Sequence, residues 1–302
     1  MSHLGRIFGK VGVLYGGSSA EREVSLRSGA AVIASLKTLG VDVVAIDASG
    51  KELVHQIVNA SLDRCLIMLH GGDGEDGHVQ ALLHQLEIPY TGSDTLGCAL
   101  AMDKMRTKKL WQTEGLLTPK SKIIDASLDV SGLRFPLAVK PITQGSSVGI
   151  HKVLSMDALA KAYEDAAQYG EVMAEEWVEG KELTVSIVDQ TALPSIWIEP
   201  KLEFYTYEAK YTKEAATCYH CPSGITPEME QNINDIALRA FATIGCSGWG
   251  RVDFMLSKDN ELYLIEVNTV PGMTNLSLVP QAAKVHGWDF ETLVLKILES
   301  SL

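Results

Sequence analysis

Several features that define other protein classes are absent from this sequence. No apolar run approaches the length that spans a membrane, and residues 1–10 carry scattered charge where a secretory signal has an apolar stretch. Basic residues are in the minority, with 26 Lys and Arg against 38 Asp and Glu, a formal net charge of -12 and a pI near 5.1. Such a chain offers no basic surface to nucleic acid or to an anionic membrane. We therefore expect a cytoplasmic protein that binds neither and that binds any phosphate only locally.

Cysteine is also scarce. The five cysteines are an odd number and are scattered along the chain, which does not suggest a disulfide framework. Cys218 and Cys221 form a C-x-x-C with His220 between them. A structural zinc site needs a second pair of ligands, however, and the neighbouring sequence has none. A plain loop is therefore favoured at this position, and a zinc or redox site remains the alternative.

The first part of the chain alternates short apolar runs with segments of helical spacing. Strands are predicted at 11–15, 41–46 and 65–69, and helices at 23–40, 53–60 and 79–86. This alternation predicts an α/β domain with a doubly wound parallel sheet. We place its end near Gly92, which makes 1–92 the N-terminal domain.

After Gly92 the pattern changes to longer strands of α+β character. Helices are predicted at 103–114 and 227–244, and strands at 122–124, 136–140, 172–178, 183–188, 195–198, 249–256 and 261–267. We expect a central domain at 93–178 and a C-terminal domain at 179–302. The polar and aromatic stretch 203–222 has no periodicity, and a loop of this length is usually a lid, a binding loop or disordered.

The last two predicted strands form a hairpin that carries an acidic cluster. With a period of two, Arg251 and Asp253 share one face of the first strand, and Glu266 and Asn268 share one face of the second. Three oxygen ligands and a guanidinium can therefore converge, and oxygen ligands are those that magnesium prefers. The alternative, paired charges on a solvated sheet face, is disfavoured because the flanking residues are strongly apolar.

Two further segments have the composition of nucleotide contacts. Lys140 ends a predicted strand before a proline, and the glycine and serine loop 144–149 follows it, so an ammonium and backbone amides can face phosphates. A simple turn explains the loop equally well, because neither a Walker A nor a G-x-G-x-x-G pattern is present.

At the predicted boundary between the central and C-terminal domains, acidic residues flank a short connection. Glu175, Glu182 and the main chain at Trp177 and Val178 could contact adenine and ribose. A charged linker without a ligand is an equally good interpretation of these residues.

Many short segments occur in the order found in one known family. They are GGSSAEREVS at 16–25, LHG at 69–71, GEDG at 74–77, YTGS at 90–93, MDK at 102–104, VKP at 139–141, GSSVG at 145–149, YEAKY at 207–211, GWGRVD at 248–253, EVNT at 266–269, PGMT at 271–274 and SLVP at 277–280. Through these segments the chain resembles the bacterial D-alanine:D-alanine ligases from about residue 11 to its C-terminus.

The resemblance implies a three-domain ATP-grasp fold in which the sheets of the central and C-terminal domains close on ATP. It implies ATP-dependent joining of two D-alanine molecules to D-alanyl-D-alanine, through a D-alanyl phosphate, for peptidoglycan precursors. Magnesium is the expected metal, as two ions that manganese can replace. A homodimer is also expected.

The resemblance also assigns residues to roles. Nucleotide and phosphate contacts are expected from Lys104, Lys140, Glu175, Trp177, Val178, Glu182 and Lys210, and magnesium ligands from Asp253, Glu266 and Asn268. Glu21 is expected to hold the ammonium of the first D-alanine, and Ser277 and Leu278 the carboxylate of the second. Arg251 and the Gly272 amide are expected to stabilise developing charge. Tyr211 is expected to link with Ser146 and Glu21, and His70 is placed near the substrates, where a structural role fits it as well.

Three other functions fit the sequence less well. A ligase that makes a D-alanyl-D-lactate ester or uses another amino acid is the nearest, but ester-forming relatives tend to carry phenylalanine where this chain has Tyr211. A regulator that binds ATP without catalysis would be expected to have lost Arg251 or a magnesium ligand, and this chain keeps them. A dehydrogenase lacks its glycine fingerprint here.

Overall fold

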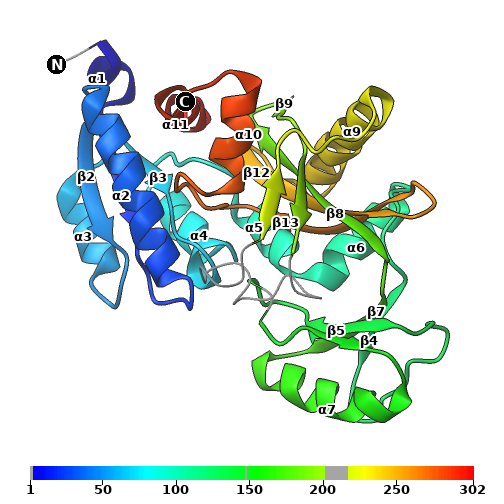
Figure 1. The fold of residues 1–302 in the computed structure, drawn as a ribbon. Coiled ribbons are helices and arrows are strands. Elements are labelled where there is room, and N and C mark those ends of the chain that lie inside the picture. Colours follow the sequence, from blue (N-terminus) through cyan, green and yellow to red (C-terminus); the bar gives the residue numbers. More distant parts are fainter. Residues whose placement is uncertain (1–2, 147, 201–216) are drawn as a thin grey trace.

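The computed structural model describes residues 3–146, 148–200 and 217–302. In these ranges the chain forms three β-sheets with helices packed against them (Figure 1). None of the helices described there is long and apolar enough to cross a membrane.

The N-terminal sheet is three-stranded and parallel, in the order β2-β1-β3. After the short helix α1 (His3–Phe8), its strands are β1 (Lys10–Tyr15), β2 (Asp42–Asp47) and β3 (Arg64–Ile67), and its helices are α2 (Arg22–Thr38), α3 (Leu53–Ala60) and α4 (His78–Gln85). Val11, Val13 and Leu14 of the middle strand are fully buried, as expected where helices cover a parallel sheet. Gly29 allows α2 to lie close, since an added Cβ would stand 2.4 Å from the Tyr15 Cβ. The predicted parallel sheet is confirmed.

The last two helices of the chain pack with this N-terminal sheet. They are α10 (Leu278–His286) and α11 (Phe290–Glu299), and Figure 1 shows α11 beside α2, with α10 next to α11. Leu293 and Val294 belong to the same buried cluster as Val32 and Leu36 of α2. Neither helix was predicted from the sequence. Their position brings the connection 269–277, which enters α10, to the edge of the N-terminal sheet.

The central sheet is antiparallel, in the order β4-β7-β5-β6. Its strands are β4 (Ser121–Ile124), β5 (Leu137–Pro141), β6 (His151–Val153) and β7 (Val172–Glu176), and α7 (Met156–Ala166) packs against it. The helix predicted at 103–114 is confirmed as α6 (Lys104–Thr113), and a further helix that was not predicted, α5 (Thr95–Met102), precedes it. Asp103 separates them in an extended conformation and caps α6 by accepting the Arg106 N–H at 2.8 Å.

The C-terminal sheet is six-stranded and antiparallel, in the order β11-β10-β8-β12-β13 with β9 beside β8. Its elements are β8 (Gly180–Val188), β9 (Thr191–Ala192), β10 (Ile196–Glu199), β11 (Cys218–His220), β12 (Trp249–Ser257), β13 (Leu262–Asn268) and the covering helix α9 (Pro227–Thr243). Ile233 and Phe241 of α9 are buried in one cluster with Val252. The predicted hairpin is confirmed as β12 and β13, which pair in antiparallel register.

The predicted lid segment 203–222 is only partly described, because residues 201–216 lie outside the described ranges. Its end is an edge strand rather than a loop, since Cys218, Tyr219 and His220 pair with β10. Both cysteines of the C-x-x-C are free thiols. The His220 ring stacks on Trp197 with centroids 4.5 Å apart, which gives it a packing role.

Candidate active site

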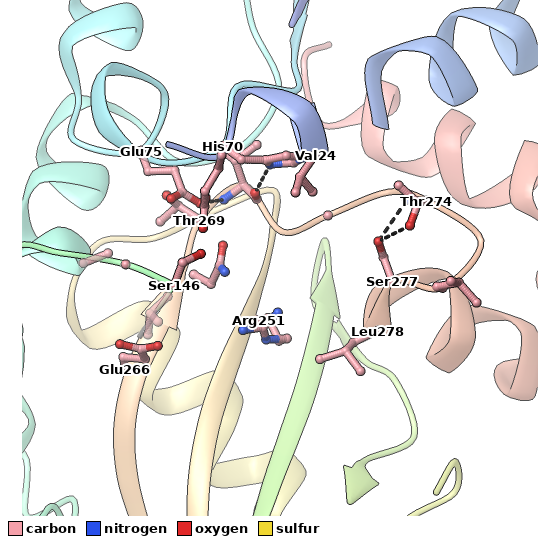
Figure 2. A pocket seen from close by; sticks show the side chains of 18 of the residues that line it. Val24, His70, Glu75, Ser146, Arg251, Glu266, Thr269, Thr274, Ser277 and Leu278 are labelled. Carbon is pink, nitrogen blue, oxygen red and sulfur yellow. Dashed lines mark hydrogen bonds between the residues drawn. The ribbon is translucent and has the colours of Figure 1, made fainter. Parts of the chain in front are cut away.

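A cavity of about 550 Å³ lies where the N-terminal sheet, the 145–146 loop and the β12-β13 hairpin meet. Of the residues expected to act, it is lined by Glu21, His70, Lys104, Ser146, Arg251, Glu266, Asn268, Gly272, Ser277 and Leu278. Figure 2 shows Arg251 between Glu266 and Ser146 on one side and Ser277 and Leu278 on the other. Residues far apart in the sequence therefore share one polar chamber.

The acidic cluster on the hairpin is assembled by strand register. Arg251 stands opposite Asn268, and Asp253 stands opposite Glu266. The Arg251 Nε and Nη2 each donate to an oxygen of Asp253 at 2.8 Å, and the Thr184 hydroxyl donates to the same carboxylate at 2.6 Å. The Asn268 Oδ1 is buried and has no hydrogen-bond partner among the described residues. Two carboxylates and an orphaned amide oxygen are a donor set that suits a hard divalent cation.

Lys104 lies at the edge of this cluster, at the first position of α6. Its ammonium donates to the Gln144 carbonyl at 2.7 Å and stands 3.3 Å from the Glu266 carboxylate. The side chain is buried. One cation therefore touches both the glycine and serine loop and the acidic hairpin, as a residue between a phosphate loop and a metal site should.

Lys140 belongs to a second cluster, a triad of charged side chains. Its ammonium pairs with one oxygen of Glu175, and the Lys108 ammonium lies 2.8 Å from the other oxygen. All three side chains are buried. Burial works to raise the pKa of Glu175, but the two ammonium groups outweigh it and the pKa falls to about 2. Burial lowers the pKa of Lys108 to about 8 against the attraction of Glu175.

The ion triad includes Glu175, one of the residues expected to contact adenine. In this structure the oxygens of Glu175 are engaged by lysines. Trp177 N–H donates to the Pro136 carbonyl at 2.9 Å. Glu182 is half-buried on β8, opposite Ile198 of β10. Together with Val178 these residues border the connection between the central and C-terminal sheets, and they do not line the 550 Å³ cavity.

At the other end of the cavity, His70 belongs to a buried hydrogen-bond chain. Its Nδ1 stands 2.7 Å from the Val270 carbonyl, so Nδ1 donates there and Nε2 accepts from the Ser28 hydroxyl at 2.9 Å. The Ser28 oxygen in turn accepts the Met273 N–H at 3.0 Å. Burial lowers the pKa of His70 to about 4, which keeps the ring neutral. His70 therefore both lines the cavity and clamps the 270–273 backbone.

Glu75 is a buried carboxyl group beside this clamp, and sequence reasoning gave it no role. Its Oε2 accepts the Gly71 N–H at 2.9 Å and its Oε1 accepts the Val270 N–H at 3.3 Å. Burial raises the pKa of Glu75 to about 8, and the nearby charge of Glu21 adds to the rise. Glu21 lies close by, because an added Cβ on Gly71 would stand 3.2 Å from its Oε2.

Ser277 begins α10 as its N-cap residue and faces the cavity. Its hydroxyl oxygen accepts the Thr274 N–H at 2.9 Å, as Figure 2 shows. Gly272 leaves the backbone open at this point, since a Cβ there would stand 2.8 Å from that hydroxyl oxygen. The start of a helix, a hydroxyl group and a bare backbone together make a favourable place for a carboxylate or an oxyanion.

Ser146 completes the lining with a positive φ of 51°. Lys210 and Tyr211 fall outside the described residues, so their expected roles stay predictions. The residues that sequence reasoning missed are Lys108, Glu75 and Ser28. A signal existed for Lys108, which follows Lys104 by one helical turn, but its partners come from other parts of the chain.

Comparison with known proteins gives a consistent result. Two family models match, described as the D-ala D-ala ligase C-terminus over residues 115–299 and the D-ala D-ala ligase N-terminus over residues 47–93. A D-alanine–D-alanine ligase of Pseudomonas putida is 48% identical over 302 residues, covering 98% of this chain and 94% of the relative. One of Francisella tularensis is 46% identical over 293 residues, covering 97% and 98%.

Solved structures agree with the sequence relatives. The Bacillus anthracis D-alanine–D-alanine ligase complexed with ATP matches with a TM-score of 0.84 and 34% identity, over 97% of each chain. The VanG D-Ala:D-Ser ligase of Enterococcus faecalis matches with a TM-score of 0.86 and 30% identity, over 97% of this chain and 99% of that one. The similarity therefore extends over nearly the whole chain.

Proposed function

The chain belongs to the D-alanine–D-alanine ligase family, and we propose that the cavity between its N-terminal sheet and its β12-β13 hairpin is where the two substrates are joined. The protein is an ATP-dependent ligase that makes D-alanyl-D-alanine for peptidoglycan synthesis, and the predicted ATP-grasp fold class is confirmed. One observation carries the placement of the reaction. The same chamber holds the Glu21 carboxylate, the Ser277 hydroxyl and the acidic hairpin, which suit an ammonium, a carboxylate and a metal respectively.

We propose that Asp253, Glu266 and Asn268 hold magnesium, for which manganese can substitute, as one or two ions. The fit rests on two opposed carboxylates and on the buried Asn268 Oδ1, which has no protein partner among the described residues. Bound there, the ion would neutralise the charge of the ATP phosphates and favour attack on the terminal one. The two hydrogen bonds from Arg251 hold the Asp253 carboxylate in place beside this site.

The nucleotide is proposed to lie between the central and C-terminal sheets. Lys104 and Lys140 supply buried ammonium groups for its phosphates, and the 144–149 loop supplies backbone amides. Glu175, Trp177, Val178 and Glu182 border the adenine and ribose end, and Lys210 is a further proposed contact.

The two D-alanine molecules are proposed to lie at the other end of the cavity. Glu21 would bind the ammonium of the first, and Ser277 with Leu278 at the start of α10 would bind the carboxylate of the second. His70 holds the 270–273 backbone, which positions the Gly272 N–H. Ser146 and Tyr211 are proposed to link the loop to Glu21.

The proposed reaction has two steps. A carboxylate oxygen of the first D-alanine attacks the γ-phosphorus of ATP, the bond to the bridging oxygen of ADP breaks, and D-alanyl phosphate forms. The neutral amine of the second D-alanine then attacks the acyl carbon, and phosphate leaves from the tetrahedral intermediate. Arg251 and the Gly272 N–H line the cavity where the new oxyanion develops, and removing one such donor typically costs about 10²–10³-fold in rate.

Three organisational features are proposed with this function. The chain divides into domains 1–92, 93–178 and 179–302, and the part of 203–222 that precedes β11 is proposed as a lid over the acyl phosphate. It acts in the cytoplasm, where ATP is available, and it forms a homodimer, as the family resemblance implies. Sedimentation of the purified protein tests the dimer, and protease cleavage within 203–222, with and without ATP and a phosphinate analogue of D-alanine, tests the lid.

A second candidate is D-alanyl-D-serine synthesis, because one solved relative is a D-Ala:D-Ser ligase at 30% identity. A single assay separates the two. Phosphate release is measured with ATP and magnesium while D-alanine, D-serine, D-lactate and L-alanine are each offered as the second substrate. We expect phosphate release and D-alanyl-D-alanine with D-alanine, and this dipeptide should remain the main product when D-serine, D-lactate or L-alanine is offered beside D-alanine. Faster product formation with D-serine would overturn the choice, and release without any amino acid dependence would overturn the ligase assignment.

A further inference from the structure

Lys108 is more deeply buried than its chemistry leads one to expect, and the proposed reaction does not use it. It lies on α6, one turn after Lys104, with 1% of its surface exposed. A lysine is almost never fully buried unless it is paired. Its ammonium lies 2.8 Å from a Glu175 oxygen and donates to the Thr118 hydroxyl at 2.6 Å.

Thr118 anchors this ammonium to the C-terminal sheet. The Thr118 hydroxyl donates to the Leu264 carbonyl of β13 at 2.8 Å. Lys108 is therefore connected to β13 through Thr118, in addition to its ion pair with Glu175. Glu175 belongs to β7 of the central sheet. Lys108 therefore bridges the two sheets between which the nucleotide is proposed to lie.

Lys140 differs from Lys108 in how it is held. Among the described residues its ammonium has one partner, the Glu175 carboxylate that it shares with Lys108. It comes from β5 and is followed by the 144–149 loop. Within the described ranges, Lys104, Lys108 and Lys140 face two carboxylates, Glu175 and Glu266, which leaves one positive charge in excess among these five groups. A buried excess of positive charge is favourable only if an anion comes to it.

We propose that Lys108 is a positioning residue for nucleotide binding, the resident counter-ion that keeps Glu175 charged and in place when Lys140 turns from Glu175 to the phosphates of ATP. The inference rests on the proposed function, because it takes Lys140 as a phosphate contact. Without Lys108, the departure of Lys140 would leave a buried carboxylate with no cation. Breaking a buried pair in this way is strongly unfavourable, so Lys140 would stay on Glu175 and the nucleotide would lose its contact.

The test is ADP binding by calorimetry to the full-length chain and its variants. Lys108→Met is expected to weaken ADP binding about 10²-fold. Lys108→Arg, which keeps the charge, is expected to retain most of the affinity. Lys109→Met is the matched control, since Lys109 is the exposed neighbour on the same helix and loses the same charge. Its ADP affinity should equal that of the unchanged protein.

A double variant separates positioning from mere structural support. If Lys108 acts through the charge of Glu175, then Glu175→Gln should remove most of the effect of Lys108→Met, so that the double variant binds ADP nearly as well as Glu175→Gln alone. Additive losses would overturn the proposal, as would unchanged binding by Lys108→Met. The KM for D-alanine should stay constant in Lys108→Met while the KM for ATP rises, whereas general damage would change both.

Two further measurements keep the result decisive. Should Lys108→Met not fold, Thr118→Val removes the anchor but leaves the charge, and it should weaken ADP binding about threefold to tenfold. Unaltered ADP binding in Thr118→Val would contradict the anchoring. If the unchanged protein binds no ADP, the proposed function fails; if it binds ADP and the variants show no selective loss, only the role of Lys108 fails.

Discussion

Two buried glutamates stand at opposite ends of the active-site region, and their surroundings differ. Glu175, at the nucleotide end, is paired with two lysines, and its pKa falls to about 2 despite burial. Glu75, at the substrate end, accepts two backbone N–H groups and faces Glu21, and burial raises its pKa to about 8. Burial works to raise the pKa of both groups. It prevails at Glu75, whereas at Glu175 the two ammonium groups outweigh it.

The difference matches the ligands that each end is proposed to receive. The lysine cluster carries an excess of positive charge, which suits the phosphates of ATP. At the other end the carboxyl groups of Glu75 and Glu21 lie close together, and the charge of Arg251 also acts on Glu75. These acidic groups suit the ammonium group of D-alanine.

The largest expected effect tests the metal site at the nucleotide end. Glu266→Gln keeps the shape of the side chain but removes a carboxylate charge, and we expect kcat to fall about 10³-fold with the fold intact. Dipeptide synthesis is measured at saturating ATP over a range of magnesium concentrations. Glu261→Gln, an exposed position on the same hairpin, is the control and should keep full activity. Near-normal synthesis by Glu266→Gln at limiting magnesium would rule out the metal assignment.

The next effect compares the two glutamates directly. Glu175→Gln leaves two buried ammonium groups without their carboxylate, so it should lower the free energy of unfolding by about 3–5 kcal/mol at pH 7. Glu75→Gln replaces a group that is largely protonated at that pH and should cost only about 1 kcal/mol. Urea unfolding of the ligand-free protein measures both. Equal costs would mean that the lysines do not distinguish the two sites.

The stability difference between the unchanged protein and each of these two variants should depend on pH, in opposite directions. The lowered pKa of Glu175 stabilises the fold above about pH 4.5, and this contribution is lost as the pH falls toward about 2. The contribution of Glu75 to stability is greatest below about pH 4.5, and its raised pKa means that this contribution is lost as the pH rises from about 4.5 through about 8. The advantage of the unchanged protein over Glu175→Gln should therefore shrink in acid, and its advantage over Glu75→Gln should shrink between about pH 4.5 and 8.

The smallest effect concerns the hydrogen bonds that hold the substrate end. Ser28→Ala leaves the Met273 N–H and the His70 Nε2 without their partner, which should cost about 1–2 kcal/mol of stability and lower kcat modestly by loosening Gly272. Ser35→Ala is a close control. Ser35 is buried in the same helix, but its hydroxyl has no hydrogen-bond partner among the described residues. If both variants behave alike, the clamp does not position the site.

Much of the architecture could be predicted from local patterns. The alternation of apolar runs and helical segments predicted the parallel sheet, and the period of two in the hairpin predicted that Asp253 and Glu266 converge. The helix α11 carries buried Leu293, Val294 and Ile297 at helical spacing, so this helix could also have been predicted. Its packing against α2 could not have been predicted, because that contact joins segments from opposite ends of the chain.

The charge clusters were beyond local patterns for the same reason. Lys108, Lys140 and Glu175 come from a helix and two strands that are separate in the sequence. A lysine and a glutamate are ordinary surface residues until a fold buries them together. Glu75 carries no local sign that it will accept hydrogen bonds from backbone groups 4 and 195 residues away.

The contrast between the two ends is tested most directly by a titration of the side-chain carboxyl groups by ¹³C NMR. The protein is labelled at the glutamate carboxyl carbon, and Glu75→Gln and Glu175→Gln assign the two signals by their absence. Between about pH 4 and 9 we predict that the Glu175 signal stays at the position of a carboxylate, while the Glu75 signal moves with a midpoint near 8. Two signals that both titrate near about 4.5, the ordinary value for glutamate, would contradict the account.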